Sequence, residues 1–140
     1  MSVQEIRIRK DGKWYADGAE MFRKPFLNLF GTHLHRDENG QYYIELNNET
    51  FYIVVEDVPF LAIDAGVRDG SIVFLLHDQQ MLEVNEEVKL HMADDKPYLS
   101  FKWDHDTLIN RSAFWMVSEF LEERDDGVYL VPPASQQQLA

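Results

Sequence analysis

Turn-forming residues recur along the whole chain, and their spacing constrains the fold more than any other feature of the sequence. Aspartate, asparagine and glycine tolerate the positive φ angles of tight turns, so pairs of them mark the ends of strands. The turn signals are Asp11-Gly12, Asp17-Gly18, Asn39-Gly40, Asn47-Asn48, Asp69-Gly70, Asp94-Asp95 and Asp126-Gly127. Short segments between such turns are typical of an antiparallel meander.

The segments between the turns have the composition of strands. They alternate apolar and polar residues, or they are rich in β-branched and aromatic residues. The predicted strands are residues 6–9, 14–15, 41–46, 51–55, 60–63, 71–76, 81–84, 89–92, 99–103 and 128–131.

Two segments carry a helical period instead. Counted from Phe26 and again from Ala113, bulky residues fall at i, i+1, i+3, i+4, i+7 and i+8, which is one face of a helix. Pro25 suits a first helical turn, and Asn110 is a predicted N-cap of the second helix. Gly31 costs a helix about 1 kcal/mol relative to alanine, which indicates close packing on its side.

An internal repeat relates the two helices. A shift of 87 positions aligns helix, turn and strand without a gap, and it pairs Leu34 with Leu121 and Gly40 with Gly127. The sequence therefore predicts an α+β fold in which two repeated hairpin–helix–strand units flank a mainly antiparallel β-meander. The predicted parts are a first unit at 1–49, the meander at 50–87, a second unit at 88–133 and a flexible tail at 134–140.

Composition excludes several classes of protein. The 45% hydrophobic content is that of a globular chain, and the absence of cysteine excludes disulfides and thiolate metal sites. A net charge of −12 argues against a nucleic-acid partner, which needs a basic face. No window approaches the roughly 18 apolar residues of a membrane span, and the first residues lack the pattern of a signal peptide. We expect a cytoplasmic protein that does not bind membranes.

The central stretch 54–64 is apolar apart from its acids, Glu56 and Asp57 among them, and Pro59 follows that pair. Its core, Val55-Glu56-Asp57-Val58-Pro59-Phe60-Leu61-Ala62, resembles the bacterial family of unknown function DUF1285. Gly18–Arg23, Gly40–Tyr42 and the helix from Asn110 to Leu121 are similar to that family too. The resemblance implies a two-part α+β fold with repeated motifs. It implies no established catalytic activity, and a signalling role has been proposed for the family.

Arg23, Glu56 and Asp57 are the predicted ligand-binding residues. Adjacent residues of a strand point to opposite faces, so Glu56 and Asp57 do not form a ready acid–base pair. One of them facing a seam between the repeated units would pair with Arg23, with Lys24 or with a ligand cation. The alternative is structural: Asp57 bonds the turn before Pro59, and Glu56 is solvated or pairs with a basic residue.

The other polar residues carry weaker signals. His33 lies on the apolar helix stripe and is predicted to be packed, and Asp104-His105-Asp106 is predicted to be a solvated loop. Trp115 lies beside the second stripe, where an exposed tryptophan would mark an interface, although packing at the edge of the core is the commoner fate of a tryptophan. The chain contains no phosphate loop, dinucleotide fingerprint, nucleophile elbow or zinc-protease motif. The sequence predicts no catalytic residue, no metal site and no cofactor.

Three hypotheses of function remain. The first is a non-enzymatic module that binds a small molecule or a protein partner, in signal transduction. The second is a hydrolase or lyase that uses Glu56 or Asp57 with a histidine at the seam. The third is a homodimer whose shared surface is the function.

Overall fold

In the computed structural model of this protein, residues 3–138 are described, and they divide into two compact units. Unit 1 comprises the described residues up to Phe60 together with His77–Gln80. Unit 2 comprises Leu61–Leu76 and the described residues from Met81 onward. The chain therefore leaves unit 1, forms two strands of unit 2, and returns to unit 1 for four residues before it leaves again.

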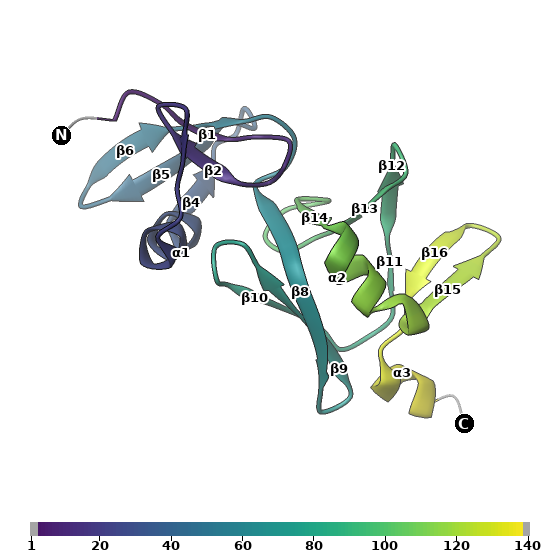
Figure 1. The fold of residues 1–140 in the computed structure, drawn as a ribbon. Helices are drawn as coiled ribbons and strands as arrows, with labels where there is room; N and C mark the ends of the chain where they lie inside the picture. The colour runs from purple at the N-terminus through teal and green to yellow at the C-terminus, as the bar shows by residue number, and fades with distance from the viewer. Residues whose placement is uncertain (1–2, 139–140) are drawn as a thin grey trace. The chain divides into compact units, whose positions relative to one another are not determined.

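Unit 1 contains two small sheets and one helix (Figure 1). Its elements are β1 (Ile6–Ile8), β2 (Trp14–Ala16), β3 (Ala19–Glu20), α1 (Lys24–Thr32), β4 (Leu34–Arg36), β5 (Tyr42–Leu46), β6 (Glu49–Tyr52) and β7 (Val54–Val55). One sheet has the order β3-β2-β1-β7, with β1 and β7 parallel, and the other has the order β4-β5-β6. The buried side chains include Ile8, Trp14, Leu27, Leu34 and Ile44.

Unit 2 is built on a six-stranded sheet of order β10-β9-β8-β14-β13-β12 and a three-stranded sheet of order β11-β16-β15. Its strands are β8 (Phe60–Arg68), β9 (Ser71–Leu76), β10 (Met81–Val84), β11 (Val88–Lys89), β12 (His91–Ala93), β13 (Lys96–Leu99), β14 (Thr107–Ile109), β15 (Leu121–Arg124) and β16 (Gly127–Leu130). Its helices are α2 (Arg111–Met116), the short 3₁₀ helix η1 (Ser118–Phe120) and α3 (Pro133–Gln138). The β8–β9 hairpin turns through Asp69 and Gly70, whose φ angles are 53° and 82°. Both positive angles suit a tight hairpin turn, as the Asp-Gly signal predicts.

The prediction of a mixed α+β fold is confirmed: strands dominate, helices are few, and the pairing is mainly antiparallel. Asn110 caps α2, because its side-chain oxygen accepts the Ala113 N–H at 2.8 Å. Among the described residues, no helix is long and apolar enough to cross a membrane. Of the predicted flexible tail, Pro133–Gln138 is helical and residues 139–140 lie outside the described range.

Both predicted helices end earlier than predicted. The first helix ends at Thr32, and Leu34 instead begins β4 and pairs with Ile44 of β5. The second helix ends at Met116, and Leu121 begins β15 opposite Leu130. In both places hairpin pairing replaces the last helical turn. A leucine at this position can be buried by a strand as well as by a helix, so the apolar pattern does not distinguish the two.

The strand predicted at 99–103 ends at Leu99, because the carboxylate of Asp106 takes the following amide groups. It accepts the N–H of Phe101 at 2.7 Å, that of Lys102 at 2.9 Å and that of Trp103 at 2.8 Å. Asp106 is only 2% exposed, so this loop is organised around a buried carboxylate and is not the solvated loop that the sequence predicts.

Candidate functional site

Glu56 lies beside β1, where it forms hydrogen bonds with residues of the first hairpin. The backbone N–H of Glu56 donates to the carbonyl of Ile8 at 2.9 Å, in line with the parallel pairing of β7 and β1. Its Oε2 accepts from Arg7 Nη1 at 3.1 Å, and its Oε1 accepts from the backbone N–H of Lys10 at 3.0 Å. Both carboxylate oxygens are therefore held by groups of unit 1.

Arg7 joins two carboxylates. Its Nε and Nη2 donate to the two oxygens of Glu5 at 3.0 and 3.1 Å, and its Nη1 donates to Glu56. The side-chain hydrogen bond from Arg7 lowers the pKa of Glu5, and the bonds from both acids raise the pKa of Arg7. These groups are near the surface, so we assign the network a positioning role in the β1–β7 pair and not a large stabilisation.

Among the described residues, Glu56 forms no hydrogen bond or ion pair with Arg23 and is held by Arg7 and Lys10. Arg23 is exposed and supplies the backbone N-cap of α1, and Asp57 is exposed after β7. Among the described side chains, the cation that pairs with Glu56 is Arg7, which the sequence reasoning did not select. The alternative in which Glu56 pairs with a basic residue describes the observed geometry.

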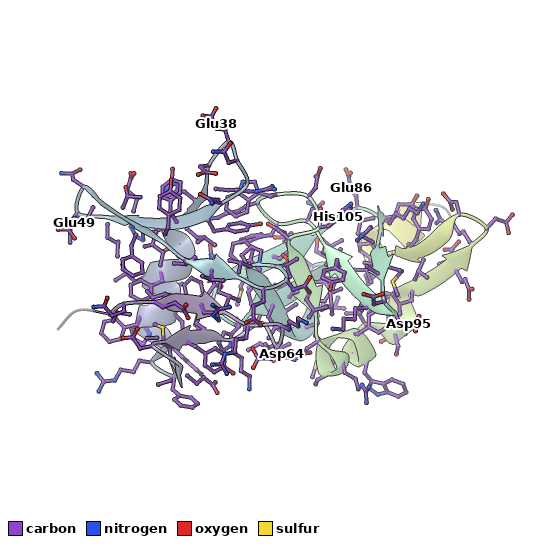
Figure 2. All side chains as sticks on the ribbon, turned by 90° about the horizontal axis from the view of Figure 1, so that it is seen from above. Glu38, Glu49, Asp64, Glu86, Asp95 and His105 are labelled. Atoms are coloured by element: carbon purple, nitrogen blue, oxygen red, sulfur yellow. The ribbon has the colours of Figure 1, made fainter. Side chains whose placement is uncertain are left out.

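An apolar cavity of about 370 Å³ lies within unit 1. It opens between α1, the first strand and the β5–β6 hairpin. Its lining residues are Val3, Ile6, Phe30, Ile44, Leu46, Glu49 and Phe51. Six of these side chains are apolar and one is a carboxylate. Figure 2 shows Glu49 at the tip of the β5–β6 hairpin, so the charged group lies at one end of the cavity.

Trp14 supports the helical wall of this cavity. Its ring is 1% exposed and stacks on the ring of Phe30, with centroids 6.2 Å apart and planes at 29°. Such offset contacts between aromatic rings add to the stability gained by burying them. The stack fixes Phe30 at the wall of the cavity. It also places Trp14, a natural fluorophore, directly behind a residue that lines the cavity.

The position of α1 is set by its close approach to the returning segment His77–Gln80. Asn28 Nδ2 donates to the backbone carbonyl of Asp78 at 3.1 Å. Gly31 faces the side chain of Asp78 so closely that a Cβ at residue 31 would overlap the carboxylate. The close packing that the glycine predicts is confirmed, and Asp78, which is 2% exposed, is the group that requires it.

His77 lies in the same returning segment, and its Nε2 is buried without a hydrogen-bond partner among the described residues. Burial lowers the pKa of His77, while the nearby carboxylates of Asp78 and Glu20 oppose the shift. A buried neutral imidazole without a partner is a group that folding keeps from binding a proton.

Because of His77, the free energy of unfolding is therefore expected to decrease as the pH is lowered. The folded pKa lies below the ordinary value of 6.5, so below pH 6.5 the unfolded chain binds more protons than the folded protein. The free energy of unfolding contributed by this group is complete above that pH and is lost as the pH falls toward the folded pKa. Urea denaturation between pH 5 and 7.5 measures the slope, and His77→Phe should flatten it. His35→Gln, at an exposed histidine, is the control. An unchanged slope in His77→Phe would assign the pH dependence to other groups.

A row of aromatic rings crosses the β4-β5-β6 sheet. Tyr43 stacks on His35 and contacts Tyr52, each at a centroid distance of 5.3 Å, and these residues are cross-strand partners. The Tyr52 hydroxyl donates to Asp37 at 3.2 Å. Burial, followed by that bond, raises the pKa of Tyr52. Cross-strand aromatic pairs stabilise sheets, and we assign the row that role.

Unit 2 has an open pocket of about 290 Å³, whose mainly apolar lining comes from β8, β9 and Met81 and includes the charged residues Asp64 and Arg68. Its other notable features are exposed side chains. The rings of His91 and His105 stack at 4.0 Å, and Trp115 is 78% exposed, as an interface residue would be. Within residues 3–138 there is no group of three or more side chains that would hold a metal ion.

Most residues of the cavity were predicted as part of a helix or strand and none as part of a site; Val3 and Glu49 lie outside the predicted elements. Phe30 belongs to the predicted helix stripe, and Ile44 and Leu46 belong to a predicted strand. No spacing in the sequence shows that these elements leave a space between them. Glu49, the one carboxylate after a turn signal in this segment, is the only local sign of a polar group beside apolar strands.

Comparisons with known proteins agree with the fold. Residues 1–58 match the model described as domain of unknown function (DUF1285), N-terminal domain. The chain is similar in structure to a DUF1285 family protein from Silicibacter pomeroyi DSS-3, with 22% identity and a TM-score of 0.71 over 97% of this chain and 83% of that one. It is also similar to a DUF1285 family protein from Shewanella baltica OS155, with 22% identity and a TM-score of 0.64 over 79% of this chain and 87% of that one. No curated protein matches the chain.

Proposed function

We propose that the protein is a non-enzymatic module that binds a small apolar ligand in unit 1, the unit that contains the residues 1–58 matched by the DUF1285 N-terminal domain model. The observation that carries the proposal is the cavity of about 370 Å³ with six apolar lining side chains. The resemblance to a family with a proposed signalling role supports signal transduction as the use of this binding, in the cytoplasm.

The size and lining of the cavity favour a ligand that is mainly hydrocarbon. Ligand sites are typically about 300–1,000 Å³ and apolar, with a few polar groups that orient the ligand. Burial of apolar surface contributes about 25 cal/mol per Å² removed from water, so an apolar ligand gains most of its affinity from the walls. Glu49 at one end disfavours a ligand that carries a negative charge there.

The contacts of Glu56 support a binding role over the competing hydrolase or lyase. A general base needs a free carboxylate oxygen within reach of the substrate proton. Both oxygens of Glu56 accept hydrogen bonds, from Arg7 and from the Lys10 backbone, and Glu56 does not line the cavity. The cavity lining offers a single ionisable side chain, Glu49, and no nucleophile or second acid–base group.

A thermal-shift screen with neutral and cationic apolar compounds tests the proposal. A ligand at a hundred times its Kd is expected to stabilise the folded state by about 2.7 kcal/mol. Leu46→Trp, which fills the cavity, should abolish the shift and leave the protein folded. Leu75→Trp, at another half-buried leucine in unit 2, is the matched control and should retain the shift. Calorimetric titration of the leading compound then gives Kd for each variant. A silent screen, or full affinity in Leu46→Trp, would remove the support for this site.

We also propose that the two units arose from one repeated pattern. The element order supports this: β1-β2-β3-α1-β4-β5 in unit 1 and β12-β13-β14-α2-β15-β16 in unit 2 are each three antiparallel strands, a helix and a hairpin. Circular dichroism and unfolding of each unit after exchange of the α1 and α2 segments would show whether the pattern tolerates substitution of one copy by the other.

A further inference from the structure

The outer face of α1 and the residues just before it carry large apolar side chains that remain exposed to a substantial extent. Phe22, two residues before the helix, is 75% exposed, Phe26 is 47% exposed, and Leu29 is 39% exposed. Phe26 and Leu29 are neighbours on the helix surface, because residues three apart lie on the same face. Clustered exposed aromatic and aliphatic groups are typical of interaction surfaces.

The core of unit 1 does not need these side chains. The buried side of α1 is formed by Leu27, which is 2% exposed, and by Gly31, while Phe30 stacks on Trp14. The apolar stripe of this helix is therefore wider than the core requires. One edge of it packs inside unit 1 and the other faces solvent.

Two cations accompany the exposed side chains. Arg23 and Lys24 lie between Phe22 and Phe26, both are exposed, and neither forms an ion pair with a carboxylate among the described side chains. The protein as a whole carries 25 acids and a net charge of −12. On such an acidic chain, Arg23 and Lys24 form a small basic surface beside exposed apolar side chains.

We propose that Phe22, Arg23, Lys24, Phe26 and Leu29, here called the α1 ridge, are a docking surface for an acidic, apolar segment of another protein. Carboxylates of that segment would pair with Arg23 and Lys24, and its apolar side chains would cover the phenylalanines. Aromatic residues and arginine are the side chains that contribute most to binding at protein interfaces. The ridge shares no residue with the lining of the unit 1 cavity, so this proposal is independent of the ligand.

Charge favours a peptide segment over an anionic membrane and over a second copy of this chain. Attachment to an anionic bilayer commonly takes clusters of about four to eight Lys and Arg residues, and the ridge has two. A bilayer also presents a negative surface to the whole protein of net charge −12, as does a second copy, whereas a short segment brings only local charge.

Selection of binding peptides from a random dodecapeptide display library on the full-length protein tests this proposal. Selected sequences should be enriched in Asp and Glu next to Leu, Ile, Phe or Trp. The Kd of the leading peptide, measured by fluorescence anisotropy, should rise at least about tenfold in Phe22→Ser/Phe26→Ser. It should rise about fivefold or more in Arg23→Glu/Lys24→Glu, and the affinity should weaken with added salt.

Trp115→Ser is the matched control, because it removes an equally exposed aromatic residue from unit 2 and should leave the Kd unchanged. Unchanged thermal unfolding of the ridge variants shows that they remain folded, as expected for exposed positions. The proposal is overturned if no peptide is enriched, if the enriched peptides lack acids, or if the ridge variants bind as well as the original. It is equally overturned if the ridge instead drives binding to vesicles containing 30% anionic lipid, tested by co-sedimentation, or dimerisation, tested by light scattering.

Discussion

Gly31→Ala is expected to destabilise the protein by about 1–3 kcal/mol, although the same change in an unconstrained helix would stabilise it by about 1 kcal/mol. The Cβ of an alanine at residue 31 would overlap the carboxylate of Asp78, which is buried and bonded to Gln80. Either α1 or the returning segment has to move, and Asn28 then loses its bond to the Asp78 carbonyl. Urea denaturation followed by far-UV circular dichroism measures the change in the free energy of unfolding.

Gly66→Ala is the matched control for this prediction. Gly66 lies in β8, and a Cβ built there meets no atom within 4 Å. Glycine in a strand costs about 0.5–1 kcal/mol relative to alanine, so this variant should be more stable than the original protein. The two glycines are therefore expected to respond with opposite signs. A stabilising effect of Gly31→Ala would show that Asp78 does not approach α1 as described.

Asp106→Ala is expected to destabilise unit 2 by about 3 kcal/mol or more, because it leaves several backbone N–H groups without their acceptor. The carboxylate accepts from three consecutive amides and from the hydroxyl of Thr107 at 2.9 Å, and it is 2% exposed. Hydrogen bonds to a charged acceptor are about twice as strong as neutral ones, and removing the acceptor also uncovers its donors. A change in tryptophan fluorescence, which reports loss of structure around Trp103, should accompany the loss of stability.

Asp104→Ala, two residues earlier in the same loop, is the control. Asp104 is exposed, and substitutions at such positions usually change stability by less than about 0.5 kcal/mol. Asp106→Asn should fall between the two, because the amide keeps one acceptor oxygen and loses the charge. If Asp106→Ala were as mild as Asp104→Ala, the carboxylate would not be the organising group of this loop.

The elements of the fold were predictable from the sequence, and their ends were not. The Asp-Gly signals predicted hairpin turns such as the one at Asp69-Gly70, since few residues accept two successive positive φ angles. The end of α1 could not be predicted, because a buried Leu34 suits the last turn of a helix and the first position of a strand equally well. Its pairing with Ile44 decides between them, and that pairing joins residues ten positions apart.

The candidate site was less predictable than the fold, because it depends on which residues meet across elements. Glu56 stood out as an acid in an apolar stretch, but its partner Arg7 is 49 residues away and alternates with isoleucines like any strand residue. The cavity in unit 1 is a space between apolar side chains. The apolar character of these residues predicts that they are buried, but it does not predict whether they leave a space between them. Gly31 was the most informative single residue, since a glycine within a helical pattern has a cost that only close packing explains.

The return of four residues to unit 1 has a consequence for how this chain can be divided. The match to the family model ends at residue 58, whereas Asp78, which packs against Gly31, comes twenty positions later. A fragment that ends at residue 58 lacks the segment that covers the inner side of α1, and it exposes the Asn28 side of the helix to water. The part of the chain that matches the family model is thus continuous in sequence, whereas the compact unit that contains it is not. Recombination that moved residues 1–58 into another protein would have to supply a substitute for His77–Gln80 from its new neighbour.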